Sequence, residues 1–182
     1  SLFHAIEQMR SDLAISDQQT QRLAQAAVQM EGQAETISER LAEVGLDDYH
    51  QRIYDLAREG ASQIAARFEA DIDEGRVNLD DLFDRNYQTI PNTSPAKYQT
   101  RFDRYADQVL PAIQEPLLPR HEGLVFAIAC TQQGYVPTHN KVFSQPLTGD
   151  AQVDTLQNRT KRKFADRTGI RCGSHQQAVL LQ

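Results

Sequence analysis

The chain has 182 residues, of which 40% are hydrophobic, and its mean hydropathy of −0.58 excludes a disordered chain and predicts a soluble globular protein. The formal net charge is −6, yet residues 1–84 carry 18 acidic and 7 basic side chains, whereas residues 85–182 carry 7 acidic and 12 basic ones. The acidic half argues against nucleic acid as a partner, because phosphate contacts dominate that affinity. With only 2 cysteines a disulfide scaffold is excluded, and a cytoplasmic, reducing compartment is expected.

A repeat of apolar residues occupies the first 45 residues, with spacings that alternate between four and three. Its thirteen positions, called the seam below, are Leu2, Ile6, Met9, Leu13, Ser16, Thr20, Leu23, Ala27, Met30, Ala34, Ile37, Leu41 and Val44. This repeat predicts a coiled-coil stalk helix over residues 1–45, and one helix cannot bury it alone, so we expect a homodimer. Four seam positions are Ala, Ser or Thr, which is typical of a loosely packed stalk or of a helix that switches between packing states.

Residues 46–120 are predicted to form a helical linker or bundle. Gly45 favours a helix stop, and a second amphipathic helix follows it and ends near Gly75. The apolar face of this helix carries Ile53, Leu56, Ala57, Ile64, Phe68 and Ile72.

Turn-forming residues divide the rest of this region. Aspartates between 80 and 84 predict a cap and a short turn, and residues 87–98, which include two prolines, predict an exposed loop. A third helix is predicted over residues 98–110. Three prolines between 111 and 119 then exclude a long helix and predict an extended or turning path.

Residues 121–182 are predicted to form a small antiparallel sheet with helices, so that the whole chain has an α+β fold. The apolar run Leu124–Cys130 predicts a buried strand, and Tyr135-Val136 predicts the return strand. A basic helix is predicted over residues 153–164, and a turn over 166–169.

A last strand is predicted at Ala178–Leu181. A strand that begins so near the end of the chain needs partners. We therefore expect the natural protein to continue and the sheet of this chain to be incomplete at its carboxyl end.

Catalytic signatures are absent, since the sequence has no Gly-rich phosphate loop, nucleophile elbow or His-Glu-x-x-His motif, and we expect no enzyme and no cofactor. Cys172 and His175 have the spacing of metal ligands, and Cys130 and His139 would complete a zinc set. The competing interpretation is that these are unrelated positions in turns. A haem sensor with a histidine ligand is a further alternative, although no Cys-x-x-Cys-His motif is present.

The densest group of polar side chains follows the predicted buried strand. The candidate ligand-binding residues in it are Tyr135, His139, Asn140, Arg159, Asp166 and Arg167. Polar side chains that converge beside a buried strand would line a pocket for a small polar or anionic ligand, whereas the alternative is a solvated helix and loops. We expect Asp166 to accept backbone N–H groups in a turn and Arg167 to reach inward toward a carboxylate.

Several of these stretches resemble a sensory module of bacterial methyl-accepting chemotaxis proteins. The similar segments are Asp81–Tyr87, Tyr98–Asp103, Val109–Pro116, Gly134–Gln145, Asn158–Gly169 and Val179–Gln182. The resemblance covers roughly residues 50–182. It implies a PAS/Cache-like fold that follows the cytoplasmic signalling hairpin of a transducer, with the remaining signalling helices as partners. The family's methylation helices and hairpin tip are not in this chain, so we do not expect it to be methylated or to bind a kinase.

We therefore expect a non-enzymatic, ligand-sensing fragment of a chemotaxis transducer in which ligand binding repacks the stalk helices. The alternatives are a ligand-free dimerisation or interaction module and, third, a metal or haem sensor. A polar cavity beside His139 and Arg159 would favour the sensor, and a filled core there would favour the interaction module.

Overall fold

The computed structural model describes residues 2–45 and 47–176, and its internal contacts divide the chain into two units. One unit contains the first helix, and the other contains every later helix and strand and is called the α/β unit below. A long amino-terminal helix and a small antiparallel sheet with helices together confirm the predicted α+β fold class. The strand predicted at Ala178–Leu181 lies outside the described residues.

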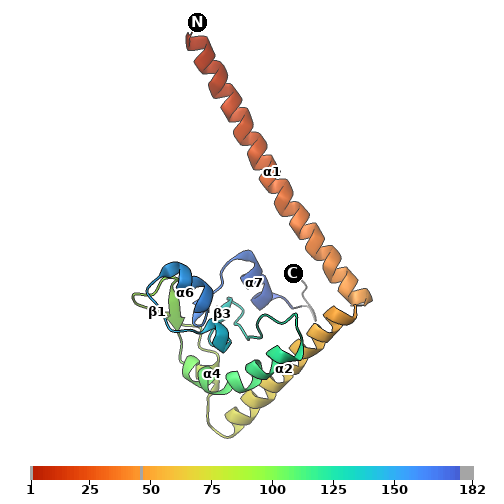
Figure 1. The fold of residues 1–182 in the computed structure, drawn as a ribbon, viewed down its shortest axis with the longest axis vertical. Helices are drawn as coiled ribbons and strands as arrows, with labels where there is room; N and C mark the ends of the chain where they lie inside the picture. The colour runs from red at the N-terminus through yellow and green to blue at the C-terminus, as the bar shows by residue number, and fades with distance from the viewer. Residues whose placement is uncertain (1, 46, 177–182) are drawn as a thin grey trace. The chain divides into compact units, whose positions relative to one another are not determined.

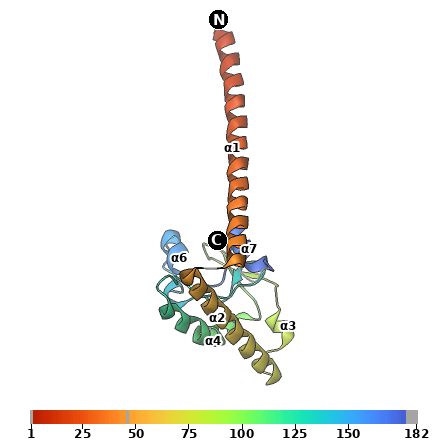
Figure 2. The same ribbon diagram turned by 90° about the vertical axis from the view of Figure 1, so that its right-hand side faces the viewer.

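The first helix, α1 (Leu2–Val44), has 43 residues and confirms the predicted continuous helix (Figures 1 and 2). Its side-chain hydrogen bonds are local, such as Gln8 Nε2 to Asp12 Oδ1 at 3.0 Å. The eight large apolar seam residues between Leu2 and Leu41 are all exposed, with exposed fractions between 43% and 80%. Three further exposed apolar residues, Phe3, Ile15 and Val28, lie outside the seam.

The second helix, α2 (Asp48–Asp73), follows the prediction closely. Asp47 caps its amino end by accepting a hydrogen bond from His50 N at 2.9 Å. At its carboxyl end Gly75 takes a φ of +72°, a conformation that glycine adopts without steric cost and that turns the chain out of the helix. The short helix α3 (Leu79–Leu82) follows, capped by Asn78.

Residues 87–98 are not simply the exposed loop that the prolines predict. They contain strand β1 (Gln88–Ile90) and most of strand β2 (Lys97–Gln99), which pair antiparallel with Gln88 opposite Gln99. The loop prediction was wrong there because three-residue strands leave no periodic pattern, and their pairing is decided by neighbours distant in sequence.

The predicted third helix is present as α4 (Asp103–Val109), shorter than its predicted range. The proline-rich stretch then forms α5 (Pro111–Gln114) and the 3-10 helix η1 (Glu115–Arg120). Short helical turns satisfy the prediction that a long helix is excluded. Pro111 begins α5 and Pro116 lies in the first turn of η1, where a missing N–H costs nothing.

The predicted buried strand Leu124–Cys130 is not a strand. Its backbone pairs instead with side-chain amides, since Ala127 N donates to Asn140 Oδ1 at 2.8 Å and Ala129 N donates to Gln114 Oε1 at 3.0 Å. Two amide side chains therefore take the place of a neighbouring strand, and no apolar pattern in the sequence reports such partners.

The sheet has the strand order β1-β2-β4-β3, with all pairs antiparallel. Strand β3 (Tyr135–Val136) confirms the predicted return strand, and its partner is β4 (Arg162–Lys163). The helix predicted over 153–164 is therefore wrong in its second half, where α6 (Ala151–Gln157) has already ended at Asn158. The predicted boundary at residue 121 falls inside the α/β unit, and the sheet takes strands from both sides of it.

The 3-10 helix η2 (Lys141–Phe143) follows β3, and α7 (Arg167–Ser174) is the last element within the described residues. The turn predicted at 166–169 is in fact the start of this helix, with Asp166 as its cap. Gly169 and Gly173 lie one helical turn apart, and a Cβ atom at either would collide with the backbone oxygen of Phe164 or Thr131. These two glycines allow α7 to lie directly against those loops.

The hydrophobic core of the α/β unit lies between α2 and α4, which run close to each other in both views (Figures 1 and 2). Its buried residues are Val77, Leu82, Phe102, Ala106, Val109 and Leu110, with Ile64, Phe68, Ile72 and Tyr105 packed against them. Among the described residues, no helix combines the length and hydrophobicity that crossing a membrane requires.

Candidate functional site

Tyr135 is a structural residue of the core and not a pocket residue. It is buried, and its hydroxyl donates to Asp103 Oδ2 at 2.6 Å and to the carbonyl oxygen of Tyr98 at 3.1 Å. Burial, followed by the hydrogen bond to Asp103, raises the pKa of Tyr135. The side chain thus ties β3 to β2 and to the first turn of α4.

His139 is buried between two aromatic rings, with its ring centroid 5.6 Å from that of Phe126 and 5.1 Å from that of Phe143. Its Nδ1 accepts a hydrogen bond from Asn140 N at 2.9 Å, so the neutral ring carries its proton on Nε2. Burial lowers the pKa of His139 to about 4, and the positive charges of Arg159 and Arg162 act in the same direction. His139 is therefore a neutral packing residue near pH 7.

Asn140 and Arg159 complete the packing around His139. Asn140 is fully buried, and its Nδ2 donates to Glu115 Oε1 at 3.1 Å. Arg159 places its guanidinium carbon 4.2 Å from the ring centroid of Phe143, the geometry of a cation–π contact. Asn140 and Arg159 thus both have hydrogen-bond partners within the protein, and Arg159 donates from Nε to Leu156 O at 3.0 Å.

Asp166 and Arg167 lie at the amino end of α7. Asp166 caps α7 by accepting a hydrogen bond from Gly169 N at 2.8 Å, which agrees with its predicted role as an acceptor of backbone N–H groups. Arg167 is exposed in the first turn of α7. The structure thus brings together His139, Asn140 and Arg159, while Tyr135 bonds to Asp103 and Asp166 bonds to Gly169 N.

The metal candidates do not form a ligand set. Within the described residues, no group of three or more His, Cys, Asp or Glu side chains is placed to hold a metal ion. Cys130 and Cys172 are exposed, whereas His139 is buried between Phe126 and Phe143.

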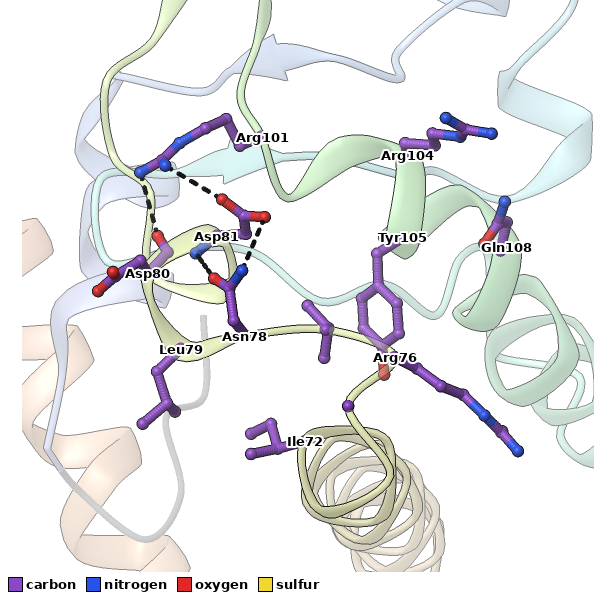
Figure 3. Close-up of a pocket in the computed structure, with 12 residues that line it drawn as sticks. Ile72, Arg76, Asn78, Leu79, Asp80, Asp81, Arg101, Arg104, Tyr105 and Gln108 are labelled. Carbon is purple, nitrogen blue, oxygen red and sulfur yellow. Dashed lines mark hydrogen bonds and ion pairs between the residues drawn. The ribbon is translucent and has the colours of Figure 1, made fainter.

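A polar pocket lies elsewhere in the α/β unit, between the carboxyl end of α2, α3 and the start of α4 (Figure 3). Its volume is about 740 Å³. The residues that line it are Ile72, Gly75, Arg76, Val77, Asn78, Leu79, Asp80, Asp81, Arg101, Arg104, Tyr105 and Gln108. Three arginines and a glutamine among them provide hydrogen-bond donors, and the ring of Tyr105 lies between Arg101 and Arg76 in the view of Figure 3.

The wall of this pocket is held by Asp71, a buried carboxylate of α2. Asp71 accepts hydrogen bonds from Tyr105 Oη at 2.6 Å, from Arg67 Nε at 2.6 Å and from Arg76 Nη1 at 3.1 Å. The bonds from Tyr105 and then from Arg67 lower the pKa of Asp71, while burial raises that of Tyr105. This network fixes Tyr105 and Arg76 beside the pocket.

The three arginines of the pocket differ in whether a carboxylate neutralises their charge. Arg76 also pairs with Glu74 at 2.5 Å, and Arg101 pairs with Asp81 at 3.1 Å. Within the described part of the chain, Arg104 makes neither a hydrogen bond nor an ion pair. It lies one helical turn before Gln108 on α4, and both point to the same side of Figure 3. An uncompensated guanidinium beside an amide donor suits a carboxylate or phosphate group.

Two further hollows adjoin this region. One, of about 480 Å³, shares Arg104 and Gln108 with the polar pocket and reaches Lys161, whose Nζ is 2.7 Å from Asp107 Oδ2. The other, of about 560 Å³, is almost wholly apolar and lies between α2 and residues 124–129. Of these three hollows, the polar pocket and its neighbour offer charged groups to a ligand.

The sequence prediction missed the pocket residues because it assigned residues 46–120 to a linker. The available signal was the pair of arginines at 101 and 104 at the start of a predicted helix. That signal is weak, because arginines on a helix are usually solvated. Their approach to Arg76 depends on the contact between α2 and α4.

No protein-family model, curated protein or solved structure matches this chain.

Proposed function

We propose that this chain is a non-enzymatic signalling fragment of the methyl-accepting chemotaxis type, acting in the cytoplasm, that self-associates through α1 and binds a small anion in its α/β unit. The remaining signalling helices of such a transducer would be its other partners. The observation that carries the proposal is the exposed seam of α1.

A helix of 43 residues with eight large apolar side chains exposed along one repeat is unlike the surface of a monomeric protein. Burying such a repeat against other helices is the usual way in which it is stabilised. A partner helix that packs loosely at Ser16, Thr20, Ala27 and Ala34 would also be able to change its packing at low cost, which is what a signalling helix requires.

The ligand site that we propose is the polar pocket of Figure 3 and not the predicted cluster around His139. Arg104 is the main binding residue, Gln108 is a second donor, and Arg76 is held beside them by Asp71. A small carboxylate or phosphate would balance the charge of Arg104 without displacing an existing ion pair.

A ligand-free interaction module is the second candidate. The observation that favours it is the filled packing around His139, where the two phenylalanine rings, Asn140 and Arg159 occupy the place at which a cavity was expected. In that case α1 still self-associates, and small anions have no effect on the α/β unit.

Sedimentation equilibrium tests the proposed self-association. The chain should be a dimer, and Leu23→Asp/Met30→Asp should raise its dissociation constant at least ~100-fold, because each change would place a charge in the buried seam. The control Gln18→Asp/Gln25→Asp adds the same two charges on the opposite face of α1 and should leave the dissociation constant nearly unchanged. A monomeric chain would contradict the proposal.

A further inference from the structure

We infer that Cys130 and Cys172 are a modification site, at which a reversible disulfide joins the end of the apolar stretch Leu124–Cys130 to α7. Both cysteines are thiols and both are exposed. Such a disulfide belongs to the α/β unit alone and is independent of the self-association of α1 and of the polar pocket. The contact between α7 and the turn that follows Cys130 places the two cysteines near each other.

Cys130 directly precedes a tight turn that is anchored in the sheet. Gly134 N donates to Thr131 O at 2.9 Å, and Gly134 takes a φ of +75°. Thr131 is buried, and its hydroxyl lies 2.8 Å from that of Tyr87 and accepts a hydrogen bond from Tyr135 N at 3.2 Å. Because Thr131 is held in this way, the backbone of the preceding Cys130 is also fixed.

The helix α7 lies against this turn with its backbone in contact (Figure 1). A Cβ atom on Gly173 would lie only 2.4 Å from Thr131 O, so the two backbones approach each other as closely as glycine permits. Cys172 adjoins Gly173, and Cys130 adjoins Thr131. The two cysteines therefore flank a single backbone contact.

The electrostatics of the two thiols agree with this placement. Burial raises the pKa of Cys130, and the charge of a Cys172 thiolate raises it further. Burial also raises the pKa of Cys172, as does the charge of Asp166. Interactions between exposed charges are screened beyond about 8–10 Å, so an effect of one thiolate on the other requires that they lie close together.

A disulfide requires Cα atoms that are about 4.4–6.8 Å apart, and α7 is able to adjust to this requirement. None of the residues that the structure describes in α7 is buried, so apolar packing does not hold this helix in one position. Cys172 has a further interaction within the chain. Such a contact does not prevent oxidation, because a thiol is only a weak hydrogen-bond donor.

The bond forms by exchange with a small disulfide such as oxidised glutathione. The thiolate of one cysteine attacks a sulfur of the oxidant, which produces a mixed disulfide and releases one glutathione thiolate. The thiolate of the other cysteine then attacks the protein sulfur of the mixed disulfide and releases the second glutathione. The two protein thiols lose two electrons to the oxidant, and their two protons pass to the released glutathione thiolates.

The raised pKa values of both thiols determine which oxidant suits the pair. Near pH 7 both remain protonated, and a protonated thiol is a poor nucleophile. Rapid reaction with peroxide is therefore not expected. Slow equilibration with a pool of small disulfides is the chemistry that this pair favours.

Titration of the full chain with mixtures of reduced and oxidised glutathione tests the site, with alkylation and mass spectrometry as the readout. The expected product has lost two hydrogen atoms and gives a tryptic peptide that joins residues 130 and 172. Glutathione adducts on both cysteines without this link would overturn the inference. So would a disulfide between two chains, seen as a covalent dimer on a non-reducing gel.

The same titration in urea shows whether the fold places the cysteines together. The effective concentration of the two thiols should be at least about 30-fold higher in the folded chain than in the unfolded one, because the fold favours the bond as much as the bond favours the fold. Equal values in buffer and in urea would overturn the inference.

Cys130→Ser and Cys172→Ser are matched controls, and each should form only a glutathione adduct. Oxidation should raise the melting temperature of the unsubstituted chain by roughly 10 °C, because the bond closes a long loop in the unfolded state. Dithiothreitol should reverse this rise, and both serine variants should lack it. An internally linked chain whose melting temperature does not rise would contradict the placement of the two cysteines at one contact.

Discussion

In α1 the large apolar side chains face solvent, whereas in the α/β unit amide and charged side chains are buried and hydrogen-bonded. Leu23 is 72% exposed, while Gln114 and Asn140 lie inside and bond to the backbone of residues 127–138. The α/β unit thus pairs these buried amides internally, whereas the apolar seam of α1 is exposed. In the proposed dimer, the two units would owe their stability to different sources, one internal and one external.

Tyrosine fluorescence measures the unfolding of the α/β unit separately from that of α1. All 6 tyrosines lie between residues 49 and 135, so the signal reports the α/β unit and not α1. Paired substitutions, one in each unit, therefore test the comparison directly.

The largest difference is expected for leucine truncation. Leu110→Ala removes a fully buried side chain and should lower the free energy of unfolding of the α/β unit by about 2–5 kcal/mol in urea denaturation, because it leaves a cavity. Leu23→Ala, on the exposed seam, should leave that free energy unchanged and should weaken only self-association. Equal effects of the two changes on tyrosine fluorescence would contradict the separation of the units.

A smaller difference is expected for glutamine. Gln114 donates to Thr138 O at 3.1 Å and accepts from Ala129 N at 3.0 Å, and Gln114→Met would leave both backbone groups without their partner. The expected loss is about 1–3 kcal/mol in urea denaturation. Gln25→Met on α1 should change the unfolding free energy of the α/β unit by less than about 0.5 kcal/mol. If Gln114→Met also lowers the free energy of unfolding by less than about 0.5 kcal/mol, water replaces both hydrogen bonds of Gln114.

The dependence of stability on pH should come partly from His139. The pKa of His139 is about 4 in the folded chain, against an ordinary value of 6.5, so between these values the unfolded chain binds more protons. The free energy of unfolding should therefore rise with pH across this window and lose about 3 kcal/mol on acidification from pH 7 to pH 4. His139→Gln should flatten this slope in urea denaturation at several pH values, whereas His4→Gln on α1 should keep it. An unchanged slope in His139→Gln would show that the buried histidine does not cause it.

The smallest effect on stability is expected at Arg104. Arg104→Gln removes an exposed guanidinium that has no partner among the described residues and should change the free energy of unfolding by less than about 0.5 kcal/mol. Inorganic phosphate or small dicarboxylates should raise the melting temperature of the unsubstituted chain, and Arg104→Gln should abolish that rise. Arg22→Gln on α1 should keep it. If the anion raises the melting temperature equally in Arg104→Gln and in Arg22→Gln, Arg104 does not bind the anion.

The predicted helices were mostly right because their signals are local. The spacing of the seam gave α1, and Gly75 marked the end of α2, since a 3.6-residue period and a glycine of positive φ act within a few residues. The strands were mostly missed. Arg162 and Lys163 read as part of a basic helix, yet they form β4 because Tyr135 and Val136 lie beside them.

The candidate site was predicted only in part for the same reason. His139, Asn140 and Arg159 do lie together, as their common polar stretch suggested. The ring of His139, however, packs between those of Phe126 and Phe143, and Arg159 lies over Phe143, so the expected cavity is filled. The pocket of Figure 3 combines Arg76 from the turn after α2 with Arg104 from α4. No spacing in the sequence connects those two residues.

Periodicity and turn residues were thus sufficient to determine the long helix, its apolar seam and the two longest helical stretches that follow it, α2 and α4, because helix formation depends on residues three and four apart. The tertiary structure alone decided which short segments pair as strands, which polar residues are buried, and where a pocket remains open. Strand pairing and side-chain burial join residues that are tens of positions apart, as with Gln114 and Thr138 or Tyr105 and Asp71. Their energies depend on the packed arrangement and not on the local sequence.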